Sequence, residues 1–397
     1  MTTNEIIALE EEFIAPTYVR PPVVFERGSG VYVYDLDGKS YLDFLGGIAV
    51  NSLGHGVPEI IGAIAQQSSK LMHVSNLYHT EPHVKLAKLL VDNTFPAKVF
   101  FCNSGSESIE GALKFSRRWA SDLGGESKHE IVSFNNAFHG RTYGAVSATA
   151  QPKYHEGFKP MLPGMVALPF NERGPLDEAL SEERTAAVIV EPIQGEGGVN
   201  PSDVEFLSCL RRICNERKIV LIFDEIQCGL CRTGKLFAYQ HHGIEPDVLT
   251  LAKPLAGGLP IGAVIMKNHI AQSLKPGMHG STFGANPVAC HVAHAVVSKM
   301  IKEGLDQQAA EMGQKLIDGL NSLREKNDDI VDVRGSGLLI GVEFKDKVDG
   351  IMAACRDAGL ILGTAGERVL RLAPPLVIEQ QHVKEALAII ERVLSSR

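Results

Sequence analysis

The stretch IVLIFDE, from Ile219 to Glu225, is a run of five apolar residues that ends in two acids. A run without alternating polar residues is typical of a strand buried on both faces, as in a parallel sheet covered by helices. Similar runs recur between residues 60 and 285 and alternate with helical stretches: Val99–Phe101, Ile131–Phe134, Val188–Val190 and Val248–Leu251. The pattern predicts an α/β domain with a mostly parallel sheet.

The sequence on either side of this region predicts a second, smaller unit. Gly30–Phe44 alternates apolar and polar side chains around Asp37-Gly38, which indicates a β-hairpin with a tight turn. After residue 286 come helical stretches, two strand-like runs (Gly337–Phe344 and Arg368–Leu372) and a last helix from about Glu379. We expect an N-terminal segment, 1–60, that packs with a small α/β domain, 286–397, and a large domain, 61–285, between them.

Composition favours a soluble globular protein. The net charge of −8 argues against a general nucleic-acid binder, because displacing counterions from phosphates needs a basic face. No run of 18 apolar residues is present, so we expect no membrane span. The first 13 residues carry four glutamates and lack the features of a signal or transit peptide. With seven scattered cysteines, which fit reduced thiols, this predicts a cytoplasmic protein.

Polar residues follow several of the predicted strands directly. Asn103–Ser106 comes after the run Val99–Phe101, Glu191 follows Val188–Val190, Asp224 follows Ile219–Phe223, and Lys253 comes two residues after Leu251. In open α/β sheets, ligands bind outside the carboxyl ends of the strands. The four groups together predict an active site at that edge of the sheet.

Three of these groups suit one kind of cofactor. Ser104 and Glu107 have the spacing of a capping box before a helix expected over Ser108–Ala120, so the Gly105-Ser106 turn can offer backbone N–H groups to a phosphate. A lysine in a partly apolar pocket, such as Lys253, has a lowered pKa and can form a Schiff base. A carboxylate such as Asp224 can keep a pyridine nitrogen protonated. The combination predicts pyridoxal phosphate.

Around these residues the chain resembles the class III pyridoxal-phosphate aminotransferases. The resemblance runs from Tyr18 to Pro375 and implies fold type I, with a large domain and a smaller α/β domain. The motifs that carry it are FFCNSGSES (Phe100–Ser108), FHGRT (Phe138–Thr142), EPIQGEGG (Glu191–Gly198), DEIQCGLCRTGK (Asp224–Lys235), LAKPLAGGLPIGA (Leu251–Ala263) and HGSTFGANP (His279–Pro287).

The resemblance implies a role for each matching residue around the cofactor. Lys253 would form the Schiff base and shuttle the substrate proton as base and then acid. Asp224 would pair with the ring nitrogen, and Gln227 would bond the ring hydroxyl. Phe138 would stack on the ring. Gly105 and Ser106 would hold the phosphate, together with Thr282 of a second subunit, so a homodimer is expected.

The resemblance also implies how substrates bind. Arg141 would clamp a substrate carboxylate, with Ser281 nearby. Glu196 would mask Arg371 when a cationic amino donor is bound and release it for 2-oxoglutarate, while Glu191 would give support. The implied donor is N2-acetylornithine, which reacts at its terminal amine in arginine biosynthesis. Ornithine, which Tyr18 could contact, 4-aminobutyrate and lysine-pathway amines remain alternatives.

Two unrelated functions are weighed against this one. Gly229-x4-Gly234-Lys235 resembles the phosphate loop of a nucleotide hydrolase, but Leu236 stands where Ser or Thr should bind Mg²⁺. Cys228-x-x-Cys231 could serve a redox or zinc protein, but it lacks a second ligand pair at suitable spacing. We therefore expect buried thiols there and no metal.

Overall fold

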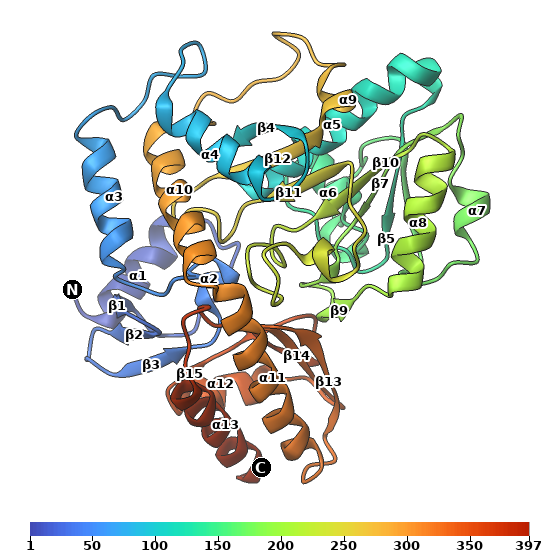
Figure 1. Ribbon diagram of the computed structural model, residues 1–397. Helices are drawn as coiled ribbons and strands as arrows, with labels where there is room; N and C mark the ends of the chain where they lie inside the picture. The colour runs from blue at the N-terminus through green and yellow to red at the C-terminus, as the bar shows by residue number, and fades with distance from the viewer. Residues whose placement is uncertain (397) are drawn as a thin grey trace.

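A computed structural model describes residues 1–396, and its largest sheet forms the centre of the upper part of Figure 1. The strands of this sheet are β4 (Ala97–Cys102), β5 (Glu130–Phe134), β6 (Met165–Leu168), β7 (Thr185–Val190), β10 (Val220–Asp224), β11 (Val248–Leu251) and β12 (Gly262–Lys267). Their order is β4-β12-β11-β10-β7-β5-β6. Only β12 runs against the others, because it pairs antiparallel with both β4 and β11.

Helices cover this sheet, whose strands are apolar on both faces. The long helix α5 (Gly105–Gly124) packs against β7, β10, β11 and β12, and α8 (Val204–Glu216) packs against β10. Every residue of β7, β10 and β11 is buried. Because the parallel strands share one carboxyl edge, the residues that follow them meet there. This confirms the predicted α/β fold.

A second sheet lies below the first in Figure 1 and has the order β13-β14-β17-β16. Its strands are β13 (Ile330–Ser336), β14 (Leu339–Phe344), β16 (Gly363–Thr364) and β17 (Val369–Leu372). The helices around it are α11 (Leu305–Arg324), α12 (Asp349–Asp357) and α13 (Gln380–Ser395). Helix α10 (Pro287–Lys302) descends towards this sheet from beside the large one.

The N-terminal part contributes to the lower region. Strands β1 (Phe25–Ser29), β2 (Tyr32–Asp35) and β3 (Ser40–Asp43) form a meander, and β3 pairs in parallel with β15 (Leu360–Ile361). The pairing of β2 with β3 confirms the predicted hairpin. The pairing of β3 with β15 supports a link between segment 1–60 and the C-terminal part. The division at residues 60 and 285 stays a prediction.

The remaining elements are short or flank these sheets. They are α1 (Thr3–Phe13), α2 (Gly46–Ala49), α3 (Pro58–Ser68), α4 (Glu81–Asp92), α6 (Tyr143–Ala148), α7 (Leu176–Ala179), α9 (Asn268–Ala271), β8 (Ile193–Gln194), β9 (Asn200–Pro201) and the 3₁₀ turns Gly125–Ser127, Pro152–Tyr154 and Ala238–His241. No helix among residues 1–396 has both the length and the apolar character that a bilayer crossing requires.

One helix begins earlier than its sequence predicts. Helix α5 starts at Gly105 rather than at Ser108, so Gly105 and Ser106 form its first turn. Ser104 Oγ accepts the N–H of Glu107 as predicted, but the Glu107 carboxylate accepts the N–H of Asn103 and not that of Ser104. The expected capping box is therefore only half formed, because the acid reaches one residue further back along the chain.

Candidate active site

A cavity of about 200 Å³ opens at the carboxyl edge of the large sheet. The residues that line it come from the segments after β4, β5, β7, β10 and β11: Ser104, Gly105, Ser106, Phe138, His139, Gly140, Glu191, Glu196, Asp224, Ile226, Gln227 and Lys253. The structure therefore gathers in one place seven of the residues that the sequence singles out: Lys253, Glu196, Gly105, Ser106, Phe138, Asp224 and Gln227.

Lys253 lies two residues beyond the end of β11, on the wall of this cavity. Burial lowers the pKa of the Lys253 amine to about 8, and the positive charge of Arg371 acts in the same direction. Both effects disfavour the charged form of an amine. A substantial fraction of Lys253 is therefore neutral near physiological pH, which a nucleophile or a general base requires.

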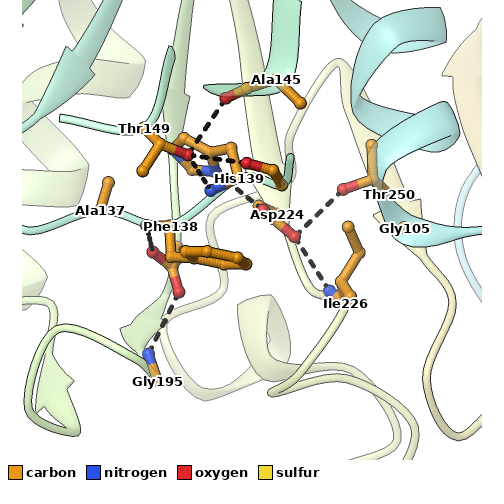
Figure 2. A network of polar contacts seen from close by, with 12 residues as sticks. Gly105, Ala137, Phe138, His139, Ala145, Thr149, Gly195, Asp224, Ile226 and Thr250 are labelled. Carbon is orange, nitrogen blue, oxygen red and sulfur yellow. Dashed lines mark hydrogen bonds and ion pairs between the residues drawn. The ribbon is translucent and has the colours of Figure 1, made fainter. Parts of the chain in front are cut away.

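Asp224, the last residue of β10, is held from two sides. Figure 2 shows His139, whose Nδ1 lies 2.7 Å from one carboxylate oxygen of Asp224. The other oxygen accepts the N–H of Ile226 at 3.1 Å and the hydroxyl of Thr250 at 3.4 Å. His139 is in turn fixed by Thr149 Oγ, which accepts the His139 N–H. The carboxylate is thus oriented at the cavity wall.

A second set of contacts involves Glu191, Phe138 and Gly195, of which Figure 2 labels the last two. The buried carboxylate of Glu191 accepts the N–H of Phe138 at 2.8 Å and the N–H of Gly195 at 3.1 Å. Burial raises the pKa of Glu191 to about 7. Both carboxylate oxygens of Glu191 accept from backbone N–H groups, so Glu191 fixes the loop that carries the Phe138 ring. This placement agrees with the supporting role that the resemblance implies for Glu191.

The first turn of α5 and the loop after Phe138 approach each other closely. Ser106 Oγ accepts the N–H of Arg141 at 3.1 Å. Gly140 has a φ of +131°, and a Cβ there would lie 2.4 Å from Ser106 Oγ. Only glycine allows this approach. Since the first backbone N–H groups of α5 have no partner within the helix, this end of the cavity suits an anion.

Glu196 and Arg371 meet at the edge of the cavity. Arg371 belongs to β17, is 4% exposed, and donates from Nη1 to Glu196 Oε2 at 3.0 Å and to Gln227 Oε1 at 3.2 Å. The Nε of Arg371 is buried and has no partner among residues 1–396. A donor that is left free in this way can serve a ligand. The structure therefore pairs the two residues that the sequence predicts as a switch.

Arg141 and Ser281 adjoin the cavity. The Arg141 guanidinium is exposed and lies 4.1 Å from the ring centre of Tyr154 and 5.5 Å from that of Phe138. Ser281 Oγ accepts from Asn103 Nδ2 at 3.0 Å, directly before the Ser104 that lines the cavity. Both side chains are within the neighbourhood that the sequence predicts.

Tyr18 and Thr282 are not brought to this cavity within one chain. Tyr18 is 74% exposed, and the guanidinium of Arg20 covers its ring. Thr282 is exposed, between Ser281 and the 62% exposed Phe283. For Thr282 this is what a residue that reaches a second subunit would show. For Tyr18 the single chain shows no contact with the other predicted site residues.

Sequence reasoning gave no role to Ile226, Thr149 or Tyr154. Ile226 lines the cavity two residues after Asp224, a spacing that a reader of the sequence could have used. Thr149 acts through His139, and Tyr154 packs on Arg141. Neither of these two contacts has a sequence signal, because each depends on how the loop 135–155 folds back on itself.

The groups in the cavity fit pyridoxal phosphate. Asp224 offers an oriented carboxylate for a ring nitrogen, Phe138 an aromatic face, Lys253 an amine for an aldehyde, and the start of α5 a set of N–H donors for a phosphate. A Cβ on Gly105 would lie 3.0 Å from the Ile226 side chain, so glycine keeps the phosphate end open. The residues of the cavity therefore match the aldehyde, the ring and the phosphate of the cofactor.

The two unrelated functions find less support. Gly229–Lys235 forms turns that lead to the 3₁₀ turn Ala238–His241 and not to the α-helix that follows a phosphate loop. Cys228 and Cys231 are buried free thiols, and burial raises the pKa of both. A buried thiol with a raised pKa is a poor nucleophile and a poor metal ligand.

Comparisons with known proteins agree with the geometry. A model of the class-III aminotransferase family matches residues 13–394. The chain is 45% identical to an acetylornithine aminotransferase of Methanocaldococcus jannaschii, over 100% of this chain and 99% of the relative. It is 46% identical to a succinylornithine transaminase of Yersinia enterocolitica, over 95% and 94% of the two chains.

A solved structure extends the agreement to three dimensions. The ornithine aminotransferase of Toxoplasma gondii, whose active site is partially occupied by PLP, is 34% identical and has a TM-score of 0.96, with 100% of this chain and 94% of that chain covered. Sequence, fold and cavity point to the same family. The chain belongs to the class-III aminotransferases, enzymes that depend on pyridoxal phosphate.

Proposed function

We propose that this chain transfers the terminal amino group of N2-acetylornithine to 2-oxoglutarate, giving N-acetylglutamate 5-semialdehyde and glutamate, in arginine biosynthesis. Relatives that span the full chain at 41–47% identity carry the name acetylornithine aminotransferase, which supports this substrate. The single observation in the structure that carries the proposal is the ion pair between Glu196 and Arg371.

This ion pair answers a problem that every aminotransferase faces, which is to accept two different substrates in one cavity. The carbon of the donor that bears the terminal amine has no carboxylate beside it, so Arg371 must be neutralised by Glu196 when the donor is bound. The reacting carbon of 2-oxoglutarate carries a carboxylate, which can take the place of Glu196 on Arg371. A single buried arginine then serves both halves of the reaction.

The far end of each substrate carries a carboxylate of its own. Arg141 directly follows Gly140, which lines the cavity, and its guanidinium lies 5.5 Å from the Phe138 ring centre, so it would bind this group in both halves of the reaction. Ser281, which accepts from Asn103, would assist it. The backbone of Arg141 is held by Ser106 Oγ. Two arginines at opposite ends of the cavity would therefore measure the length of the substrate.

At the reacting carbon, Lys253 would remove and return the proton. When bound, pyridoxal phosphate supplies an electron sink that stabilises the charge left by this proton. Asp224, oriented by His139 and Thr250, would keep the ring nitrogen charged, and Gln227 would donate from its amide nitrogen to the ring hydroxyl, since Arg371 already occupies its oxygen. Phe138 would cover one face of the ring, and Gly105 and Ser106 would bind the phosphate.

A second candidate donor is N2-succinylornithine. The relative from Yersinia enterocolitica that bears this substrate in its name is as similar as the acetylornithine enzymes, at 46% identity. Acetyl and succinyl donors differ only in the group on the α-amine, so the same Lys253 and Arg371 chemistry serves both. Free ornithine, 4-aminobutyrate and lysine-pathway amines stay alternatives, with Tyr18 as the residue to contact ornithine.

We further propose that the enzyme is a cytoplasmic homodimer. Large apolar side chains are exposed close to Thr282 and in the segment 71–78: Leu77 is 86% exposed, Tyr78 67% and Phe283 62%. Clustered exposed apolar residues favour a protein interface. A second chain placed there could bring Thr282 to the phosphate end of the neighbouring cavity. Sedimentation of the purified protein tests the dimer, which a monomer would contradict.

Steady-state kinetics would decide the donor. With 2-oxoglutarate as acceptor, we expect kcat/KM to be highest for N2-acetylornithine, followed by N2-succinylornithine, and at least about tenfold lower for ornithine and 4-aminobutyrate. The free α-ammonium group of ornithine is an uncompensated charge that costs binding energy, and 4-aminobutyrate is one carbon shorter and lacks the acylated amine. A higher kcat/KM for ornithine would replace the proposed donor. Absence of transamination with all four amines would reject the proposed function.

A further inference from the structure

Arg232 is a buried arginine in the segment that follows Asp224 and has no role in the proposed reaction. Arg232 is 1% exposed and has no carboxylate partner among residues 1–396. Its Nη1 donates to the carbonyl oxygens of Leu338, at 3.1 Å, and of Pro374. Burial lowers its pKa to about 10, so the side chain remains charged at neutral pH. A buried charge that is met only by carbonyl groups is unusual and calls for a function.

The two carbonyl acceptors of Arg232 lie at one end of the strand pair that carries Arg371. Leu338 directly precedes β14, and Pro374 comes two residues after β17. These strands are antiparallel, with Gly341 opposite Arg371 and Ile340 opposite Leu372. The start of β14 therefore lies beside the end of β17. One guanidinium nitrogen of Arg232 donates to a backbone carbonyl next to each of these two strand ends.

The backbone around Arg232 makes the same connection. The carbonyl oxygen of Arg232 accepts the N–H of Leu338 at 2.9 Å, and the carbonyl oxygen of Thr233 accepts the hydroxyl of Ser336 at 2.8 Å. Gly337 has a φ of +54°, and a Cβ there would lie 2.4 Å from the backbone of Thr233. The seam between residues 231–234 and 336–338 is therefore too tight for any side chain at Gly337.

The same loop connects to the cofactor end of the cavity. It begins at Asp224, passes Gln227, whose amide oxygen accepts from Arg371, and reaches Arg232 five residues later. One continuous segment thus lines the cavity, contacts the Arg371 side chain and binds the end of the strand that carries Arg371. Its position sets the distance between the reacting groups and Arg371.

From this geometry we infer that Arg232 is a positioning residue for dicarboxylate recognition, which holds the β14–β17 strand end so that Arg371 reaches a carboxylate in the cavity. The inference rests on the proposed function, in which Arg371 binds the second carboxylate. Arg232 itself touches neither substrate nor cofactor. Removing it should therefore weaken the binding of dicarboxylates and leave the amino donor, which depends on Arg141, largely unaffected.

The test uses the holoenzyme and glutarate, a dicarboxylate that binds without reacting. Calorimetry gives the Kd of glutarate for the wild type, Arg232→Met and Arg232→Lys, and kinetics gives KM for the oxo-acid acceptor and for the amino donor. We expect Arg232→Met to raise both the Kd of glutarate and the acceptor KM by about tenfold. The donor KM should change by no more than about twofold. Arg232→Lys, which keeps a buried donor, should restore part of the affinity.

Arg211→Met is the matched control. Arg211 is another largely buried arginine with a free Nε, but it lies on α8 and pairs with Asp247, which directly precedes β11 of the large sheet. It should lower the melting temperature without changing the ratio of the two KM values. A purely structural role for Arg232 would give the same pattern as Arg211, and that result would overturn the inference. If Arg232→Met does not fold, Arg232→Gln takes its place, because its shorter, uncharged amide cannot bind the carbonyl oxygens of Leu338 and Pro374 together. A wild-type Kd of glutarate and an unchanged KM ratio in Arg232→Gln would overturn the inference.

Arg371→Met separates this inference from the function on which it rests. If Arg371→Met leaves the Kd of glutarate unchanged, Arg371 does not bind the second carboxylate and the proposed function fails at that point. If Arg371→Met abolishes glutarate binding while Arg232→Met binds as well as the wild type, the proposed function stands and the positioning role of Arg232 is wrong.

Discussion

The cavity has two regions that are built in different ways. Its floor, which we define as Asp224, His139 and Lys253, lies in or shortly after buried strands, and His139 and Asp224 are fixed by a contact within one chain. The other predicted substrate and phosphate contacts, Tyr18, Arg141 and Thr282, which we call the rim, lie on exposed segments, and only Arg141 contacts residues of the cavity in the single chain. One chain therefore brings the residues of the floor together, but it does not bring Tyr18 and Thr282 to the cavity.

This difference suggests separate tasks for the two regions: the floor would carry out the reaction, and the rim would select the substrate. Rigid strand ends hold the groups that move a proton, which must be placed within a fraction of an ångström. In the proposed function, exposed loops hold the groups that would select the substrate, and these groups can vary between relatives that act on different amines. Changes to the floor should therefore affect every substrate strongly, and changes to the rim should affect particular substrates weakly.

The largest effect is expected at Lys253. Lys253→Ala should lower kcat by about a thousandfold for every donor, because no other group would move the proton. Lys267, at the opposite edge of the same sheet, is the matched control, and Lys267→Ala should retain activity. Stopped-flow kinetics of each half of the reaction gives the measurement. Turnover of Lys253→Ala at the parent rate would contradict the assignment of the whole floor.

Asp224 should come next. Asp224→Asn keeps the size of the side chain and removes its charge, so kcat should fall roughly ten- to a hundredfold. The absorbance of the bound cofactor should change as the ring nitrogen loses its proton. Thr250→Val removes only the 3.4 Å contact to the same carboxylate and should have a much smaller effect. Equal losses in the two variants would mean that Asp224 acts through packing and not through charge.

The pH dependence of cofactor uptake tests the floor without turnover. Only the neutral amine of Lys253 can capture an aldehyde, so uptake by the apoprotein should slow by about tenfold for each pH unit below the pKa of about 8. Arg371→Met removes a positive charge that lowers this pKa, so the inflection should move to higher pH. An inflection of the wild type at the ordinary lysine value of 10.5 would contradict the lowered pKa.

Glu196 lies between floor and rim, and its effect should be intermediate and selective. Glu196→Ala frees Arg371, so glutarate should bind about fivefold more tightly, since a partly exposed ion pair contributes about 1 kcal/mol. The donor KM should rise. Glu343→Ala, which removes the ion pair with Arg334 in the small sheet, is the control and should change neither value. Unchanged glutarate affinity in Glu196→Ala would exclude the switch.

The smallest effect is expected at Tyr154 on the rim. Tyr154→Leu removes the ring on which the Arg141 guanidinium lies, so KM should rise about two- to fivefold for donor and acceptor alike. Tyr154→Phe keeps an aromatic face and should behave like the wild type. Both are read from initial rates at several substrate concentrations. A large loss in Tyr154→Phe would show that the hydroxyl, and not the ring, is important.

The sequence predicted the floor better than the rim, for a physical reason. Five residues follow apolar runs closely enough that the sheet alone brings them together: Ser104, Glu191, Asp224, Gly105 and Lys253. The contact between Glu196 and Arg371 joins residues 175 positions apart and rested on resemblance. The antiparallel strand β12 was not predicted, because its apolar run looks like the others and nothing local gives its direction. The predicted contact of Thr282 with a phosphate requires the proposed second chain, so one chain does not test it.

The reversed strand β12 sets a length. It lies between β4, which leads to the phosphate end of the cavity, and β11, which leads to Lys253. The strands β4 and β11 are therefore separated by two inter-strand spacings, roughly 9.5 Å. The residues after these two strands would bind the two ends of one molecule of pyridoxal phosphate. If β4 were paired with β11 directly, that span would halve, and no rotation of a lysine side chain could restore the fit at both ends. Strand β12 contributes no residue to the proposed reaction, but its position between β4 and β11 sets the distance between the two ends of the cofactor site.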